Sequence, residues 1–139
     1  MRRAGRVAAV QILYQLDTGE RWALADELVP MFFDYLGTEV AGEARSFAEA
    51  LVGGAVARLE EIDRLIERAS EHWRIARMSR VDRSILRLAA FELLSDEGTP
   101  PRVVLNEAVE LAKELGAEES SSFVNGVLNR VASNLGLAI

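Results

Sequence analysis

Apolar residues recur at helical spacing along almost the whole of this 139-residue chain. In the segment 59–71, for example, Leu59, Ile62 and Ile66 fall on one face of a helix. Such spacings are typical of amphipathic helices, whereas half-buried strands need strict alternation of apolar and polar residues. No segment shows that alternation, and no longer unit repeats along the chain. The sequence therefore predicts an all-α fold of about seven helices.

Short stretches rich in glycine, proline and charged residues separate the predicted helices. One of them, "WRIARMS" at 73–79, could separate two small packed bundles. We expect a single domain, 1–139, with an N-terminal helical bundle at about 1–76 and a C-terminal helical bundle at about 77–139. The expected helices cover 4–16, 22–36, 44–57, 59–71, 78–94, about 102–115 and about 120–135.

Glycines stand inside two of the predicted helices. The pair Gly53-Gly54 costs its helix about 1 kcal/mol per residue relative to alanine, so we expect another helix to approach closely there. In "FVNGVLNRVA", Asn125-Gly126 is a dipeptide typical of tight hairpin turns, yet the surrounding apolar residues keep helical spacing. We therefore expect a helix in which Gly126 permits close packing onto a neighbour.

Local signals also indicate where helices begin or break. Ser79 and Asp82 have capping-box spacing, and the acid suits the positive end of a helix dipole. Ser120 or Ser121 is the expected N-cap of the last helix. Pro30 indicates a break or a kink inside the second predicted helix.

The sequence contains few of the residues and motifs on which enzyme active sites usually depend. The chain has no cysteine, and His72 is its only histidine, so a catalytic triad or a histidine-rich metal site would depend on that residue. A phosphate-binding glycine loop and a nucleophile elbow are both absent from the sequence. We expect no enzyme activity, no cofactor and no metal. No apolar run reaches the roughly 20 residues that span a membrane, so we expect a cytoplasmic protein without membrane contact.

Charge is distributed unevenly along the chain. The net charge of -6 argues mildly against bulk non-specific binding of nucleic acid. However, Arg2, Arg3 and Arg6 open the chain, acids prevail over 17–49, and arginine is dense over 58–87. Arginine stacks on bases and forks onto phosphate better than lysine does. A genomic preference for arginine codons explains the composition equally well.

The first predicted helix could present an RNA-binding surface. Arg3, Arg6 and Gln11 could share one side of it, with Tyr14 one turn further on. Arginine for phosphate, glutamine for base edges and an aromatic ring for stacking would suit single-stranded RNA. An exposed, frayed basic terminus is the alternative, and residue types alone favour it.

Three long stretches carry a resemblance to a known family. "RRAGRVAAVQILYQ", "DRSILRLAAFELL" and "NEAVELAKELGAEESSSFVNGVLNRVA" closely resemble the NusB family of bacterial transcription antitermination factors. The match covers nearly the whole chain in the correct order, and only the acidic stretch 17–45 lacks a distinctive motif.

The resemblance implies a fold and a function. Members of the family are all-helical, with an N-terminal and a C-terminal bundle. They bind the boxA element of ribosomal RNA leader transcripts together with NusE, which is also a protein of the small ribosomal subunit. The pair joins an antitermination complex on RNA polymerase with NusA and NusG, without a cofactor or catalysis. Monomers and homodimers both occur in the family, so the oligomeric state stays open.

The resemblance also implies site residues. The first residues of the chain correspond to an arginine-rich terminus that contacts RNA, and Phe123 matches an aromatic residue at the RNA surface. Tyr14 and Asp82 resemble positions at or near the NusE interface. The RNA-binding set expected from residue types and resemblance together is Arg2, Arg3, Arg6, Gln11, Glu119, Ser122, Phe123 and Asn125.

Three positions depart from the family pattern. Ala4 stands where many members have another arginine, and Ser122 stands where relatives are often basic. Fewer cations imply weaker RNA binding or a shallower dependence on salt. Leu115 stands where some members carry an aromatic residue, which argues against a stacking contact there.

Two other functions fit the same helical pattern. The chain could be a protein-interaction module without RNA binding, which the thin basic patch and the negative net charge allow. It could also be an accessory domain of a ribosomal RNA methyltransferase, which would require it to be a fragment of a longer protein.

Overall fold

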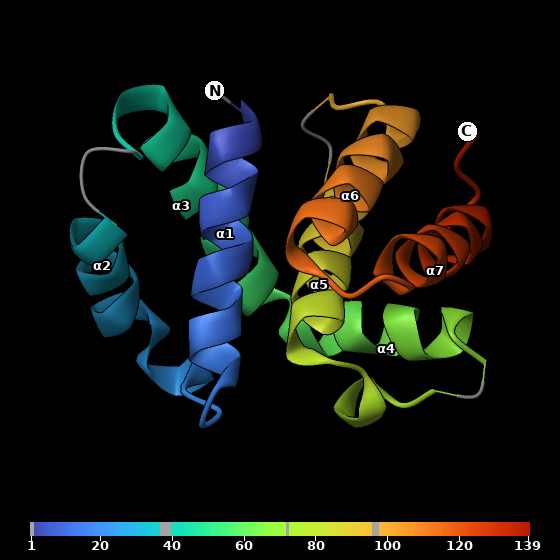
Figure 1. The fold of residues 1–139 in the computed structure, drawn as a ribbon, viewed down its shortest axis with the longest axis horizontal. Coiled ribbons are helices and arrows are strands. Elements are labelled where there is room, and N and C mark those ends of the chain that lie inside the picture. Colours follow the sequence, from blue (N-terminus) through green and yellow to red (C-terminus); the bar gives the residue numbers. More distant parts are fainter. Residues whose placement is uncertain (1, 37–39, 72, 96–97) are drawn as a thin grey trace.

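The computed structural model of the protein describes residues 2–36, 40–71, 73–95 and 98–139 (Figure 1). Within these ranges the chain forms α-helices and short 3₁₀ helices and no strand, which confirms the predicted fold class. The elements are α1 (Arg2–Asp17), η1 (Trp22–Leu24), α2 (Ala25–Leu36), α3 (Gly42–Ala57), α4 (Leu59–Ala69), η3 (Ile75–Arg77), α5 (Arg80–Leu94), α6 (Pro101–Leu115) and α7 (Ser120–Asn134).

Helix α5 is the centre of the fold. It packs against α1 and α3 on one side and against α4, α6 and α7 on the other (Figure 1). Every residue of α5 from Ser84 to Leu93 is buried. Helix α4 packs onto α5 and α7, so it lies with helices of the later half. The division into bundles at about residue 76 stays a prediction.

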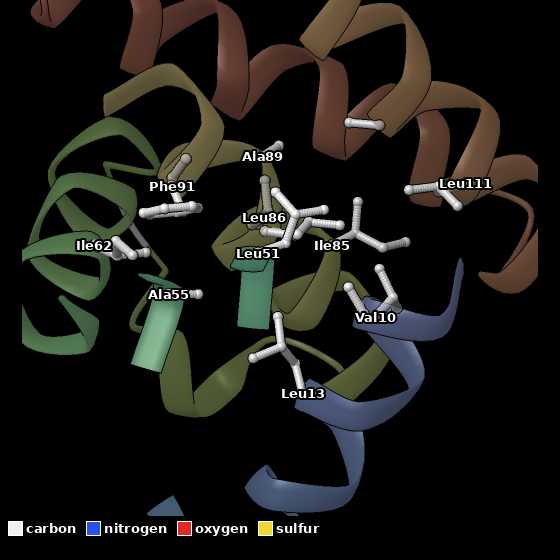
Figure 2. Close-up of a cluster of buried hydrophobic side chains, with 14 of the residues drawn as sticks. Val10, Leu13, Leu51, Ala55, Ile62, Ile85, Leu86, Ala89, Phe91 and Leu111 are labelled. Carbon is white, nitrogen blue, oxygen red and sulfur yellow. The ribbon is translucent and has the colours of Figure 1, made fainter. Parts of the chain in front are cut away.

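The core is one continuous cluster of apolar side chains. Figure 2 shows Val10 and Leu13 of α1, Leu51 of α3, and Ile85 and Leu86 of α5 converging in it. Burying a side chain of this size stabilises the fold by about 1.5–3 kcal/mol. Because α6 and α7 bury residues in the same cluster, it also fixes them relative to the start of α1.

Gly54 lies where α3 meets α5. A Cβ atom on Gly54 would overlap Cζ of the buried Phe91, so only glycine fits there, as predicted for the glycine pair. Gly53 differs, because a Cβ atom at that position would meet no atom of the described residues within 4 Å. The close approach therefore depends on Gly54 alone.

Gly126 lies within α7, which confirms the predicted helix through Asn125-Gly126. The predicted close packing is wrong, because a Cβ atom at Gly126 would meet no atom within 4 Å in the part of the chain that the structure describes. Helix α7 buries Val124 and Val127 against the core. Two residues turn a helix by about 200°, so Gly126 points away from the side that Val124 buries.

Exchanging each glycine of the α3 pair for alanine should have opposite effects. Gly54→Ala is expected to lower the free energy of unfolding by about 1–3 kcal/mol, because its methyl group would overlap the ring of Phe91. Gly53→Ala, the matched control, should raise it by up to about 1 kcal/mol through helix propensity. Urea unfolding measures both. Equal stabilities would mean that the ring of Phe91 moves aside without cost.

Of the two predicted helix N-caps, one is confirmed and the other is wrong. Ser79 is the N-cap of α5, and its Oγ accepts a hydrogen bond from the Asp82 N–H at 3.1 Å, as predicted. The N-cap prediction for α7 is wrong: Ser120 is already helical and its Oγ accepts from the Ala117 N–H at 2.9 Å, within the preceding turn. Pro30 does not break its helix, because α2 runs from Ala25 to Leu36 with Pro30 inside it. Phe33, three residues after the proline, is buried, and such packing stabilises the helix.

Candidate nucleic-acid interface

A groove of about 620 Å³ joins the start of α1 to α6 and to the first turns of α7. It brings together three residues of the predicted RNA-binding set, Arg3, Ser122 and Asn125. Asn125 is exposed, as expected for an amide that reads bases. The groove is lined by Arg3, Asn106, Glu107, Val109, Glu110, Lys113, Ser121, Ser122 and Asn125.

Lys113 is the second cation of the groove and is absent from the predicted set. Asn106, Glu110 and Lys113 follow one another at spacings of four and three, which places them on one face of α6. That spacing was visible in the sequence. The sequence did not show which side of α6 faces α1 and α7, because that depends on tertiary packing.

Arg3 is held by an exchangeable partner. Its Nη2 lies 2.8 Å from Oε2 of Glu107, and the Arg3 side chain is 59% exposed. This hydrogen bond with Glu107 is the main cause that raises the pKa of Arg3. Ion pairs between exposed side chains contribute little to stability, so a phosphate could replace Glu107 at low cost.

Arg6 lies inside the protein instead of in the groove. It is 3% exposed, and its Nε and Nη2 donate to the two carboxylate oxygens of Glu92 at 2.9 and 2.8 Å. The hydrogen bond with Glu92 raises the pKa of Arg6. The expectation that Arg6 contacts RNA does not fit this position, because the guanidinium fork already binds a carboxylate that α5 contributes.

Arg2 and Gln11 also lie outside the groove. The exposed Arg2 stacks on the ring of Phe47 in α3, with its Cζ atom 4.7 Å from the ring centroid. Gln11 lines a separate, mainly apolar hollow with Phe32 and Tyr35 of α2. Neither Arg2 nor Gln11 therefore lines the groove beside Arg3.

A second, smaller hollow of about 280 Å³ lies beside the first turn of α7. Phe123 and Glu119 of the predicted set line it, together with Trp73 and Arg77 from the connection between α4 and α5. Phe123 is half-buried and also packs against the core. Because Ser122 lines the groove and Phe123 lines the hollow, the two depressions lie on either side of one helical turn.

The two predicted partner-binding residues lie at one end of the α1–α5 pair. Nε of Arg83 in α5 lies 2.6 Å from Oδ2 of Asp17 in α1, which joins the end of α1 to the start of α5. Tyr14 is half-buried just before this junction, and Asp82 is half-buried just beside it. The Asp82 carboxylate has no hydrogen bond or ion pair within the described ranges, and its Oδ1 is buried.

The described residues hold neither a metal-binding cluster nor a membrane span. No group of three or more histidine, cysteine, aspartate or glutamate side chains among them could hold a metal ion. None of the described helices combines the length and the apolar character that crossing a membrane requires. His72 lies outside the described residues.

Comparisons with known proteins identify the family of this chain. The profile of the NusB family matches residues 3–133. The transcription antitermination protein NusB of Sorangium cellulosum (strain So ce56) is 45% identical over 137 residues, covering 97% of this chain and 94% of that protein. The structure of T. maritima NusB is 36% identical with a TM-score of 0.82, covering 96% of this chain and 91% of that one.

A further solved structure contains antitermination factors NusB and NusE in complex with double-stranded RNA. The matching chain is 33% identical to this one with a TM-score of 0.74, and the match covers 96% of both chains. Family profile, full-length sequence identity and fold all agree. This chain belongs to the NusB family.

Proposed function

We propose that the protein is a transcription antitermination factor that binds boxA-type single-stranded RNA of ribosomal RNA leader transcripts together with NusE. Its membership of the NusB family, over nearly all of its length, is the observation that supports this most strongly. Selective binding of a boxA-like RNA that tightens when NusE is added tests the proposal.

The groove has the residue types that such a ligand needs. Arg3 and Lys113 can bind phosphates, the exposed amide of Asn125 can reach a base edge, and Phe123 beside the groove can stack on a base. Among the residues that the structure describes, two cations line the groove, and the net charge of the chain is -6. We therefore expect the groove itself to contribute only a shallow dependence of RNA affinity on salt, because its two cations release few counterions.

Glu107 competes with RNA for Arg3 in this proposal. Glu107→Gln is expected to tighten RNA binding by up to about fivefold, the value of one exposed ion pair. Glu110→Gln is the matched control, because Glu110 lines the same groove without a hydrogen bond to Arg3. Anisotropy titrations at low salt measure both variants. Equal tightening by the two variants would mean that only the net charge of the groove matters.

Tyr14 and Asp82 are the proposed contacts for NusE. Asp82→Arg is expected to weaken association with NusE by about tenfold or more, because it reverses a charge whose carboxylate has no partner among the described residues. Asp26→Arg, which makes the same change in the first turn of α2, is the control. Calorimetry measures both. Unchanged association for Asp82→Arg would leave Asp82 as a first-turn residue of α5 only.

The wider assembly belongs to the same proposal. In it the protein works in the cytoplasm by binding, without catalysis, in an antitermination complex on RNA polymerase with NusA and NusG. A homodimer that covers the groove would compete with RNA. Analytical ultracentrifugation with and without RNA distinguishes such a dimer from a monomer whose groove is always exposed.

A further inference from the structure

The stretch from Trp73 to Arg80 carries cations that the structure leaves unpaired. Arg74, Arg77 and Arg80 are exposed, and none of their side chains makes a hydrogen bond or an ion pair to any residue that the structure describes. Trp73 beside them is 52% exposed. Most other arginines, in contrast, have partners, as Arg3, Arg6, Arg45, Arg58, Arg83, Arg87 and Arg130 do.

The backbone that carries these side chains is firmly held. Oε2 of Glu67 accepts a hydrogen bond from the Ile75 N–H at 2.8 Å, and Oγ of Ser70 donates to the Trp73 carbonyl at 2.7 Å. Nη1 of Arg83 donates to the carbonyls of Ile75 at 3.3 Å and Met78 at 3.4 Å. The backbone of this stretch therefore loses little conformational entropy when a ligand binds.

Trp73, Arg77 and Phe123 line the same hollow of about 280 Å³. Aromatic faces next to arginine are the combination that binds unpaired bases and their phosphates. Asp82, the proposed NusE contact, also lines the hollow, so a base bound there would lie beside NusE. Glu119 lines it too, and its carboxylate can accept hydrogen bonds only. A base with an exocyclic amino group therefore fits this lining better than one without.

We propose that residues 73–80 form a second RNA-contacting surface, in which one unpaired base occupies the hollow lined by Trp73 and Phe123 while Arg74, Arg77 and Arg80 bind the phosphates beside it. The inference rests on the proposed RNA binding. A strand that crosses the first turn of α7 would pass from the groove at Ser122 to the hollow at Phe123.

Tryptophan fluorescence reports on the hollow directly. The chain has two tryptophans, so Trp22→Phe leaves Trp73 as the only one. Titrating this variant with unlabelled single-stranded boxA-like RNA should quench the Trp73 emission as a base stacks on the ring. The same RNA with its bases scrambled should quench it less at equal concentration.

Affinity measurements test the cations separately. Arg74→Gln combined with Arg77→Gln should weaken RNA binding about tenfold and lower the salt slope by about 1.4, or about 0.7 for each phosphate contact on a single strand. Arg64→Gln combined with Arg68→Gln is the matched control, because these two exposed arginines of α4 also lack ion pairs in the described ranges. Trp73→Ala should weaken RNA binding about tenfold. Urea unfolding shows whether each variant keeps its fold. If Trp73→Ala is unfolded, the arginine variants alone test the proposal.

The outcomes separate this inference from the proposed function. One outcome is that the wild type binds RNA selectively, the Trp73 emission does not change, and the two double arginine variants bind RNA with equal affinity. That outcome would overturn the second surface and leave the proposed function standing. Loss of NusE binding without loss of RNA binding in Trp73→Ala would assign the hollow to the protein partner and also overturn it. No RNA binding by the wild type, with or without NusE, would overturn the proposed function itself.

Discussion

Arg6→Ala is expected to lower the free energy of unfolding by about 3–5 kcal/mol, the usual loss when one partner of a buried ion pair is removed. The Glu92 carboxylate would remain buried, at 7% exposure, without the guanidinium that now donates two hydrogen bonds to it. Denaturant unfolding followed by circular dichroism measures the loss. RNA binding should fall too, because Arg6 holds the start of α1 against α5.

A double variant separates this structural role from direct RNA contact. Arg6→Met combined with Glu92→Met removes both charges and keeps the volume apolar, which often restores stability. We expect it to recover most of the free energy of unfolding and also the RNA affinity. A double variant that is stable but binds RNA poorly would show that the Arg6 guanidinium contacts RNA after all. A loss below about 1 kcal/mol in Arg6→Ala would mean that the pair behaves as an exposed one.

Phe123→Leu is expected to weaken RNA binding by about 1–3 kcal/mol, the value of one stacked base, which is roughly 5- to 150-fold. Leucine keeps the apolar packing of Phe123 against the core, so the free energy of unfolding should change by less than about 1.5 kcal/mol. Anisotropy with a boxA-like RNA and urea unfolding of the same preparation measure the two effects.

Phe123→Ala serves as the comparison. It should weaken RNA binding to a similar degree but also lower stability further, because it leaves a cavity beside the core. Wild-type RNA affinity in the leucine variant would remove Phe123 from the site and leave it a packing residue.

Local signals in the sequence predicted local structure well. The helical spacing of the apolar residues yielded seven α-helices in the described part of the chain, and the serine at Ser79 caps α5 as expected. These features depend on residues three or four positions apart, which lie close together in any helix. The first helix begins at Arg2 and the third at Gly42, each two residues earlier than expected.

Features that depend on distant residues were not predictable in the same way. Glu92 lies 86 positions from Arg6, and nothing near Arg6 in the sequence indicates that its ion-pair partner is a buried carboxylate. Whether Gly54 or Gly126 meets a neighbour depends on which side of the helix faces the core. Helical spacing locates that side only to within about one residue, so one glycine prediction succeeded and the other failed.

The candidate site shows the same limit. The residue types at Arg3, Ser122 and Asn125 were predicted, and the structure places them around one groove although more than 110 positions separate Arg3 from the other two. Lys113 and Trp73 were missed as site residues because α6 and the connection between α4 and α5 reach these surfaces only through tertiary packing.

Fluorescence anisotropy with a short boxA-like single-stranded RNA tests the central claim most directly. The titration compares this RNA with a scrambled sequence and with a duplex of the same length, with and without NusE, at two salt concentrations. We predict selective binding of the boxA-like single strand that NusE tightens and that rising salt weakens. Equal binding of all three RNAs, or no binding even with NusE, would contradict the proposed function.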